Sequence, residues 1–132
     1  MRLAPLLLLL TSTALGAAAE TPMTAAEFDA YVTGKTLFFG SGGQAYGAEE
    51  YKPDRRVIWS FLDGDCREGE WYPSGEQICF TYVHDPDPQC WSFYRAPGGL
   101  RAVFENDPTR TVLYEARQSA EPMWCLGPEV GV

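Results

Sequence analysis

The sequence predicts a mainly β protein: a small antiparallel β meander that forms a barrel or half barrel, with one short N-terminal helix. Three observations lead to this fold class. Apolar residues recur with a period of two from residue 35 onward, turn residues recur at short intervals, and one segment near the N-terminus carries helical signals instead. Short strands joined by tight turns pair as antiparallel neighbours, whereas parallel strands need long crossover connections.

The first 19 residues have the three parts of a secretory signal peptide. Arg2 supplies the positive n-region, the leucine run at 6–10 supplies the apolar h-region, and Ala17-Ala18-Ala19 is a small-residue cleavage site. A membrane anchor is the alternative, but the apolar run is too short and is interrupted by three hydroxyl residues. We therefore expect a signal peptide at 1–19, a single disulfide-stapled β domain at 20–132, a periplasmic or secreted protein, and no membrane span.

A helix is expected shortly after the predicted cleavage site. Thr24 and Glu27 form a capping box, in which each side chain bonds to the backbone N–H of the other residue. The apolar stripe that follows at helical spacing is Phe28, Tyr31 and Val32. Gly34 stands where a left-handed cap ends a helix. We expect the stripe to pack over one end of the sheet.

Seven or eight short strands are expected after the helix. Gly, Pro and Asp cluster between them, and these residues supply turn conformations that strand residues disfavour. The expected strands are 35–39, 44–51, 56–62, 68–72, 77–83, 89–95, 100–105 and 111–116. No internal repeat or linker divides the chain.

Two expected strands are apolar on both faces. Large apolar side chains follow one another at 57–62 and 78–83, which a sheet with one solvated face does not need. The helix, the Gly-rich segment 40–43 or the C-terminal tail can cover part of the second face, and a ligand or partner protein is the functional alternative. We expect part of the aromatic set to line a concave ligand site with few charges inside. The set is Trp59, Phe61, Tyr82, Trp91 and Phe93.

The four cysteines are expected to form two disulfides, because an even number in an exported chain indicates a disulfide framework. Four cysteines allow three connectivities. Ten residues, including an Asp- and Pro-rich turn, separate Cys79 from Cys90, and a hairpin there can place the two opposite each other. Cys66 then pairs with Cys125. A zinc site is the alternative, but no C-x-x-C pair is present.

Charge narrows the range of partners. The net charge is −8 without a basic stripe, so the surface repels nucleic acid phosphates and we expect no nucleic-acid binding. An acidic surface suits a cationic partner, and it also keeps an exported monomer soluble.

No catalytic signature stands out from the sequence. The single histidine, His84, precedes an Asp-Pro-Asp-Pro run that can bind a hard cation or orient a base, but an exposed turn explains the same residues. Five glutamates can supply a carboxylate pair for glycoside hydrolysis, with tryptophans as sugar platforms. They are Glu49, Glu50, Glu68, Glu70 and Glu115. Acidic residues that alternate with aromatics are, however, typical of the solvent face of a strand. We predict no catalytic residue, no metal ligands and no cofactor.

Four short motifs follow one another between residues 24 and 95, each present once. They are residues 50–57, Gly69-Glu70-Trp71, residues 75–82 and Cys90-Trp91. This order resembles small exported bacterial proteins of unknown function, in which a turn after a tyrosine leads to a Gly-x-Trp strand and a Leu-Cys strand precedes a second cysteine. The chain departs from the pattern at Arg55, where the pattern carries Gly. The resemblance implies a lipocalin-like barrel or half barrel and the pairing of Cys79 with Cys90, and it implies no catalytic residue.

These observations lead to three functional hypotheses. The first is a non-enzymatic β module that binds a small apolar or aromatic ligand or an envelope protein, because the aromatic side chains exceed what one sheet face holds. The second is an inhibitor of a cationic cell-wall hydrolase, and the third is a carboxylate-based hydrolase. A co-purified ligand would indicate the first, and salt-sensitive binding to a basic protein would indicate the second.

Overall fold

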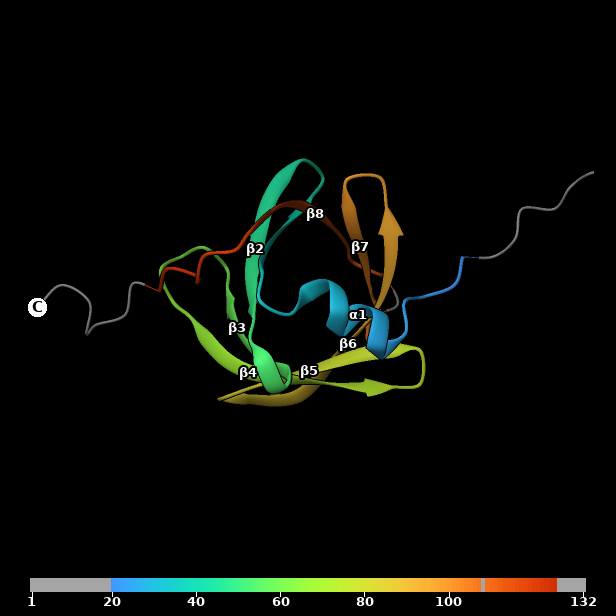
Figure 1. Cartoon of the computed structure of the whole chain (residues 1–132), viewed down its shortest axis with the longest axis horizontal. Helices are drawn as coiled ribbons and strands as arrows, with labels where there is room; N and C mark the ends of the chain where they lie inside the picture. The colour runs from blue at the N-terminus through green and yellow to red at the C-terminus, as the bar shows by residue number, and fades with distance from the viewer. Residues whose placement is uncertain (1–19, 108, 126–132) are drawn as a thin grey trace, which may run out of the picture.

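The computed structural model describes residues 20–107 and 109–125, which form a closed barrel of eight antiparallel strands and one α-helix (Figure 1). Each strand pairs with the next along the chain, and β1 pairs with β8 to close the barrel. The strands are β1 Thr36–Ser41, β2 Gln44–Tyr51, β3 Arg56–Ser60, β4 Arg67–Ser74, β5 Gln77–Tyr82, β6 Asp85–Ala96, β7 Gly99–Phe104 and β8 Val112–Ser119. A barrel of eight strands encloses enough room for packed side chains or one small ligand. The predicted fold class is confirmed, in its closed form.

All eight expected strands are present, and the largest differences lie in β6 and β8. β6 begins at Asp85 because Asp85 pairs with Tyr82 across a tight turn. Within that turn His84 is exposed and has a φ of +74°. β8 continues to Ser119 because its polar end pairs with Thr36 of β1. Strand pairing thus extends both strands beyond the apolar alternation that predicted them.

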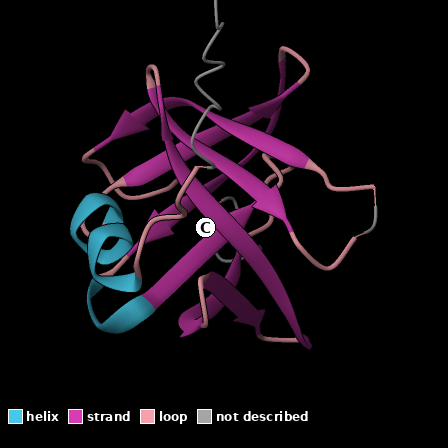
Figure 2. Ribbon diagram, turned by 90° about the vertical axis from the view of Figure 1, so that its right-hand side faces the viewer, coloured by secondary structure: helices cyan, strands magenta, loops and turns pink. Residues whose placement is uncertain are grey.

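The helix α1 (Ala25–Val32) closes one end of the barrel. The Thr24 hydroxyl oxygen accepts a hydrogen bond of 3.2 Å from the backbone N–H of Glu27, and Gly34 after the helix has a φ of +85°. Figure 1 shows α1 in the middle of the ring of strands, and Figure 2 shows it at one side of the barrel. The predicted capping residue and stop residue are therefore confirmed.

Phe28 of α1 is the centre of the closed end. Its side chain is fully buried. Four aromatic rings surround it at centroid distances from 4.5 to 6.4 Å, those of Tyr51, Trp71, Phe80 and Phe93. Aromatic pairs in tilted and edge arrangements add to the energy of apolar burial. The helix is therefore an integral part of the barrel core, because its main apolar side chain fills one end of the interior.

A short 3-10 turn, η1 (Pro53–Arg55), joins β2 to β3. Arg55 has a φ of +60°, in the left-handed region that glycine occupies most easily. Its guanidinium lies 4.9 Å from the centroid of the Trp71 ring. The position at which the chain departs from the resembled pattern thus has a backbone conformation that suits glycine.

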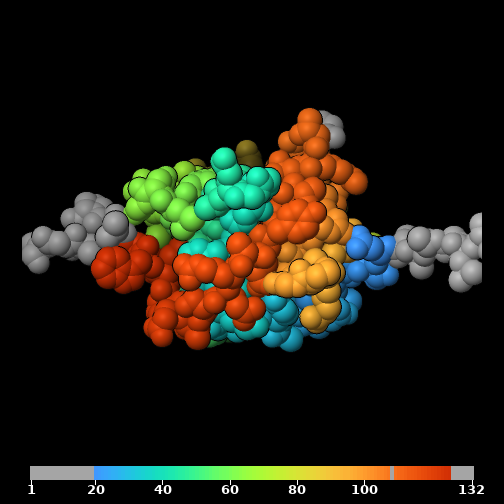
Figure 3. All heavy atoms as spheres, turned by 90° about the horizontal axis from the view of Figure 1, so that it is seen from above, coloured from blue at the N-terminus to red at the C-terminus, as the bar shows by residue number. Residues whose placement is uncertain are grey.

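Both predicted disulfides are present. Cys79 and Cys90 are directly opposed on β5 and β6, and Cys66 joins Cys125 in the C-terminal segment. The first and last described residues lie at opposite ends of the molecule in Figure 3, where they are blue and red. The second disulfide therefore ties a segment that follows the last strand back to the loop before β4.

The buried apolar side chains of the described residues form one hydrophobic core. It contains side chains from α1 and from most of the strands, with Phe28, Leu37, Ile78 and Leu100 almost fully buried. Within the described ranges, no helix has the length and apolar character needed to cross a membrane. The expected signal peptide at 1–19 lies outside the described residues.

Candidate ligand cavity

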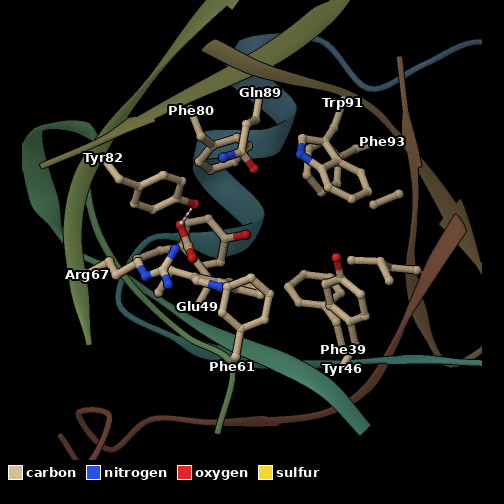
Figure 4. Close-up of a pocket in the computed structure, with 14 residues that line it drawn as sticks. Phe39, Tyr46, Glu49, Phe61, Arg67, Phe80, Tyr82, Gln89, Trp91 and Phe93 are labelled. Carbon is tan, nitrogen blue, oxygen red and sulfur yellow. Dashed lines mark hydrogen bonds between the residues drawn. The ribbon is translucent and has the colours of Figure 1, made fainter. Parts of the chain in front are cut away.

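The barrel interior contains a cavity of about 70 Å³ on the inner side of α1, the helix that closes one end of the barrel (Figure 4). All five aromatic residues predicted to surround a concave site line it. The lining side chains are Phe39, Tyr46, Glu49, Tyr51, Trp59, Phe61, Arg67, Phe80, Tyr82, Gln89, Trp91, Phe93, Ala102 and Leu113. A water molecule needs roughly 10–15 Å³ of such space and a benzene ring fills a cavity of roughly 150 Å³. This volume holds several waters or one small chemical group, so the body of a larger ligand must extend out of the cavity.

The opening is formed by aromatic rings that are partly exposed. Phe61 is 44% exposed and Tyr46 is 37% exposed. The Tyr46, Trp59 and Phe61 rings contact one another at centroid distances of 5.3 to 6.1 Å. The guanidinium of Arg67 lies 5.2 Å from the centroid of the Phe61 ring. An apolar ligand body therefore meets ring faces and edges before it reaches the interior.

An irregularity in strand pairing directs Tyr46 to this opening. Phe39 and Gly40 of β1 pair with Gly47 and Ala45 of β2, so Tyr46 has no pairing partner. Strict alternation from Glu49 would turn Tyr46 outward, but a bulge re-aims the side chain at its position. Tyr46 was not among the predicted site residues, because a bulge leaves no clear mark in the sequence.

Two glycines make room for aromatic rings inside the barrel. A Cβ atom on Gly47 would overlap the Trp59 indole, and one on Gly69 would overlap the Tyr82 ring. Glycine in a strand interior weakens the strand, and it often marks the close approach of another group. These two positions therefore allow Trp59 and Tyr82 to lie against the neighbouring strands.

Glu49 is a buried carboxyl group in the cavity wall. Its side chain is 2% exposed, and its Oε1 accepts a hydrogen bond of 3.0 Å from the Tyr82 hydroxyl. Oε2 is buried without a hydrogen-bond partner, and the ion pairs within 20–107 and 109–125 do not include Glu49. Burial raises the pKa of Glu49 well above its usual value, whereas the Tyr82 hydrogen bond lowers it. In Figure 4 the carboxyl group lies beside the Tyr82 hydroxyl, among the lining side chains.

Two tyrosines extend this polar region. Burial raises the pKa of the Tyr51 hydroxyl, and the negative charges of Glu49 and Glu115 raise it further. Burial and the charge of Glu49 also raise the pKa of the Tyr82 hydroxyl, while Arg67 lowers it. Both hydroxyls thus remain protonated beside acidic groups and can donate hydrogen bonds.

Glu115 is a second buried carboxylate, but it is not part of the cavity lining. It accepts hydrogen bonds from the Tyr31 hydroxyl at 2.8 and 3.1 Å, from the Leu100 N–H at 3.2 Å and from Gln118 at 3.5 Å. A Cβ atom on Gly99 would overlap this carboxylate. Burial, followed by the hydrogen bond to Glu115, raises the pKa of Tyr31 to about 12. Glu115 therefore joins α1 to the barrel wall.

From the sequence, Glu49, Glu50, Glu68, Glu70 and Glu115 were expected on the solvent face of their strands. This expectation is wrong for Glu49 and Glu115, which are buried. Both lie opposite inward residues, because Glu49 pairs with Trp59 and Glu115 pairs with Phe39. Glu68 and Glu70 are exposed, and Glu50 accepts a hydrogen bond of 3.1 Å from the backbone N–H of Met123. Register alone decides which glutamates turn inward.

The sequence also raised two other chemistries, glycoside hydrolysis and metal binding. Among the described residues that line the cavity, Glu49 is the only carboxylate, so these residues do not form the carboxylate pair of a glycoside hydrolase. Among the described side chains, no group of three or more His, Cys, Asp or Glu residues is arranged to hold a metal ion.

Gln89 is a further lining residue that the sequence did not predict, and it donates a hydrogen bond of 3.1 Å to Asp85. Glu49 and Arg67 are the two charged residues among the described side chains that line the cavity.

Comparison with protein-family models, curated proteins and solved structures found no match to this chain.

Proposed function

We propose that this protein is an exported, non-enzymatic barrel that binds a small apolar or aromatic ligand through the cavity opening. The observation that carries the proposal is the aromatic lining of a cavity that also contains Glu49 and the Tyr82 hydroxyl. Ligand sites in proteins combine apolar and aromatic walls with a few polar groups that orient the ligand. Stability alone does not require this arrangement, because an unpartnered carboxyl oxygen and exposed rings both cost free energy.

The size of the cavity sets the way in which such a ligand binds. About 70 Å³ of interior space receives one small group. The ligand body then lies at the opening among Tyr46, Trp59 and Phe61, where ring faces are accessible. We therefore propose a ligand with a narrow head and an apolar body rather than a bulky, fully enclosed one.

Export is the second part of the proposal. Residues 1–19 have the composition of a signal peptide, and both disulfides are typical of an oxidising compartment such as the periplasm or the extracellular space. Mass spectrometry of the protein from the periplasmic fraction should give a chain that begins at Glu20. A chain that retains residues 1–19 would contradict export by this route.

Tryptophan fluorescence tests the ligand proposal directly. Trp59 and Trp91 line the cavity, whereas Trp124 is 82% exposed and lies outside its wall. Titration with benzyl alcohol or cyclohexylmethanol should change the emission of the wild type and of Trp124→Phe in a saturable manner. The Trp59→Phe and Trp91→Phe variants should lose most of that change. If no neutral, cationic or anionic apolar compound produces a saturable change, the ligand proposal fails and a protein partner becomes the leading hypothesis.

A further inference from the structure

Within residues 20–107 and 109–125, one buried polar group of the cavity wall has no hydrogen-bond partner, and this group indicates the chemistry of the ligand head. Oε2 of Glu49 is buried and accepts no hydrogen bond, while Oε1 accepts one from Tyr82. A buried carboxylate is costly unless both of its oxygens accept hydrogen bonds. We propose that the ligand head is a protonated organic amine, which donates to Oε2 of Glu49 beside the Tyr82 hydroxyl. This inference rests on the proposed ligand site and adds the class of ligand to it.

The charges around the cavity favour a cation over an anion. Glu49 is the only acidic residue among the described residues of the wall, and when ionised its charge acts on both the Tyr51 and the Tyr82 hydroxyl. Without a cationic partner, burial favours the protonated, neutral form of Glu49. Among the described residues no ion pair includes Glu49, so a ligand ammonium group supplies the opposite charge that stabilises its carboxylate. Charge-assisted hydrogen bonds of this type are about twice as strong as neutral ones.

Arg67 is the one basic residue that the described part of the chain contributes to the wall, and it does not cancel this preference. Arg67 is exposed at the opening, where water and salt screen its charge. Glu49 is 2% exposed, and charges interact more strongly where the surroundings are dry. The attraction of a buried ammonium group to Glu49 therefore outweighs its repulsion from Arg67.

The space and the rings favour a primary amine on an apolar body. The cavity of about 70 Å³ accommodates an aminomethyl group more easily than a bulky trimethylammonium group. The rings of Tyr46, Trp59 and Phe61 then contact the apolar body at the opening. A primary ammonium also has the N–H donors that Oε2 requires, whereas a quaternary ammonium has none.

Calorimetric titration with three matched probes tests the inference. Benzylamine, benzyl alcohol and benzoate share one ring and differ in their head group. We expect the wild type to bind benzylamine at least about tenfold more tightly than benzyl alcohol, the difference typical of a charge-assisted hydrogen bond, and to bind benzoate weakest. Benzyltrimethylammonium should bind more weakly than benzylamine, because it is bulkier and has no donor.

Variants of two adjacent glutamates identify the group responsible. Glu49→Gln should lose at least about tenfold in benzylamine affinity and less than about threefold in benzyl alcohol affinity. Glu50→Gln changes the next residue on the outer face of the same strand, and it should leave both affinities unchanged. Tyr82→Phe keeps the ring and should weaken benzylamine binding less than Glu49→Gln does.

Each outcome separates this inference from the proposed function. If benzyl alcohol binds in the cavity as tightly as benzylamine, or if Glu49→Gln leaves benzylamine binding unchanged, the amine inference is wrong while the ligand proposal stands. If benzoate binds best, the head group is an anion and Arg67 becomes its partner. If none of the probes binds, the proposed function itself fails.

Discussion

The two ends of the barrel use the same residue types in opposite ways. At the closed end, Phe28 is surrounded by four rings, and Glu115 receives hydrogen bonds from α1, β7 and β8. At the open end, the Phe61 ring is 44% exposed and Glu49 has a buried oxygen without a donor. A satisfied buried network adds rigidity, whereas an unsatisfied one costs free energy. The closed end therefore contains groups whose contacts stabilise the fold, whereas the open end contains two groups whose arrangement costs free energy.

The largest expected difference between the two ends concerns their phenylalanines. Phe28→Ala should lower the free energy of unfolding by about 3–5 kcal/mol, because it leaves a hole among four rings. Phe61→Ala should lower it by about 1 kcal/mol or less, since the ring is largely exposed. Urea unfolding of both variants measures these changes. Equal losses would remove the distinction between a structural end and a binding end.

Removing the Glu115 carboxylate should have the next largest effect. Glu115→Ala leaves the Tyr31 hydroxyl and the Leu100 N–H without their acceptor, so the free energy of unfolding should fall by about 2–4 kcal/mol. Tyr31→Phe removes a single donor and should cost about 1 kcal/mol. Denaturant unfolding at pH 7 gives both values. A loss below 1 kcal/mol for Glu115→Ala would mean that this carboxylate does not hold α1 in place.

Replacing Glu49 should raise the free energy of unfolding at high pH, in contrast to replacing Glu115. Burial raises the pKa of Glu49 in the folded state, so the folded protein holds a proton that the unfolded chain releases above its ordinary value of 4.5. The wild type therefore loses stability as the pH rises from about 4.5 towards the folded pKa, because the unfolded state binds fewer protons there. Glu49→Gln lacks this loss, and at pH 8 it should be more stable than the wild type by about 1–3 kcal/mol.

Thermal unfolding of the wild type and Glu49→Gln at pH 5 and pH 8 measures this effect. The advantage of the variant should be smaller at pH 5, where less of the wild-type penalty has developed. Glu50→Gln serves as the control and should show no comparable pH dependence. If Glu49→Gln is less stable than the wild type at pH 8, Glu49 is a structural residue like Glu115.

The smallest effect is expected at His84, in a turn outside both carboxylate sites. His84→Ala should change the free energy of unfolding by no more than about 0.5 kcal/mol, because the side chain is exposed and makes no described hydrogen bond. Adding a chelator should likewise leave the melting temperature unchanged. A chelator-dependent drop would indicate a cation at the Asp- and Pro-rich segment after His84. The variant supplies the baseline against which changes at the two ends are judged.

Local signals in the sequence predict the helix ends, the strand ends and the disulfide pairing of this protein. Thr24 and Gly34 mark the ends of α1, and turn residues mark the ends of every strand. The spacing of Cys79 and Cys90 predicted their pairing, since residues on either side of a tight turn meet across a hairpin. The five predicted aromatic residues all line one cavity because each is an inward residue of the barrel or lies at its opening. Their role in ligand binding stays a prediction.

The tertiary structure alone decided which polar residues face the interior. Glu49 and Glu50 are neighbours of identical chemistry, and only the pairing of Glu49 with Trp59 turns one of them inward. Tyr46 lines the cavity because a bulge interrupts alternation, and β1 meets β8 only when the whole sheet has curved around. Turns and caps follow from a few adjacent residues, whereas closure and register depend on strands far apart in the chain. The sequence by itself therefore determined the elements and their order, and the tertiary structure determined the site, because a shift of one residue in register exchanges the two faces of a strand.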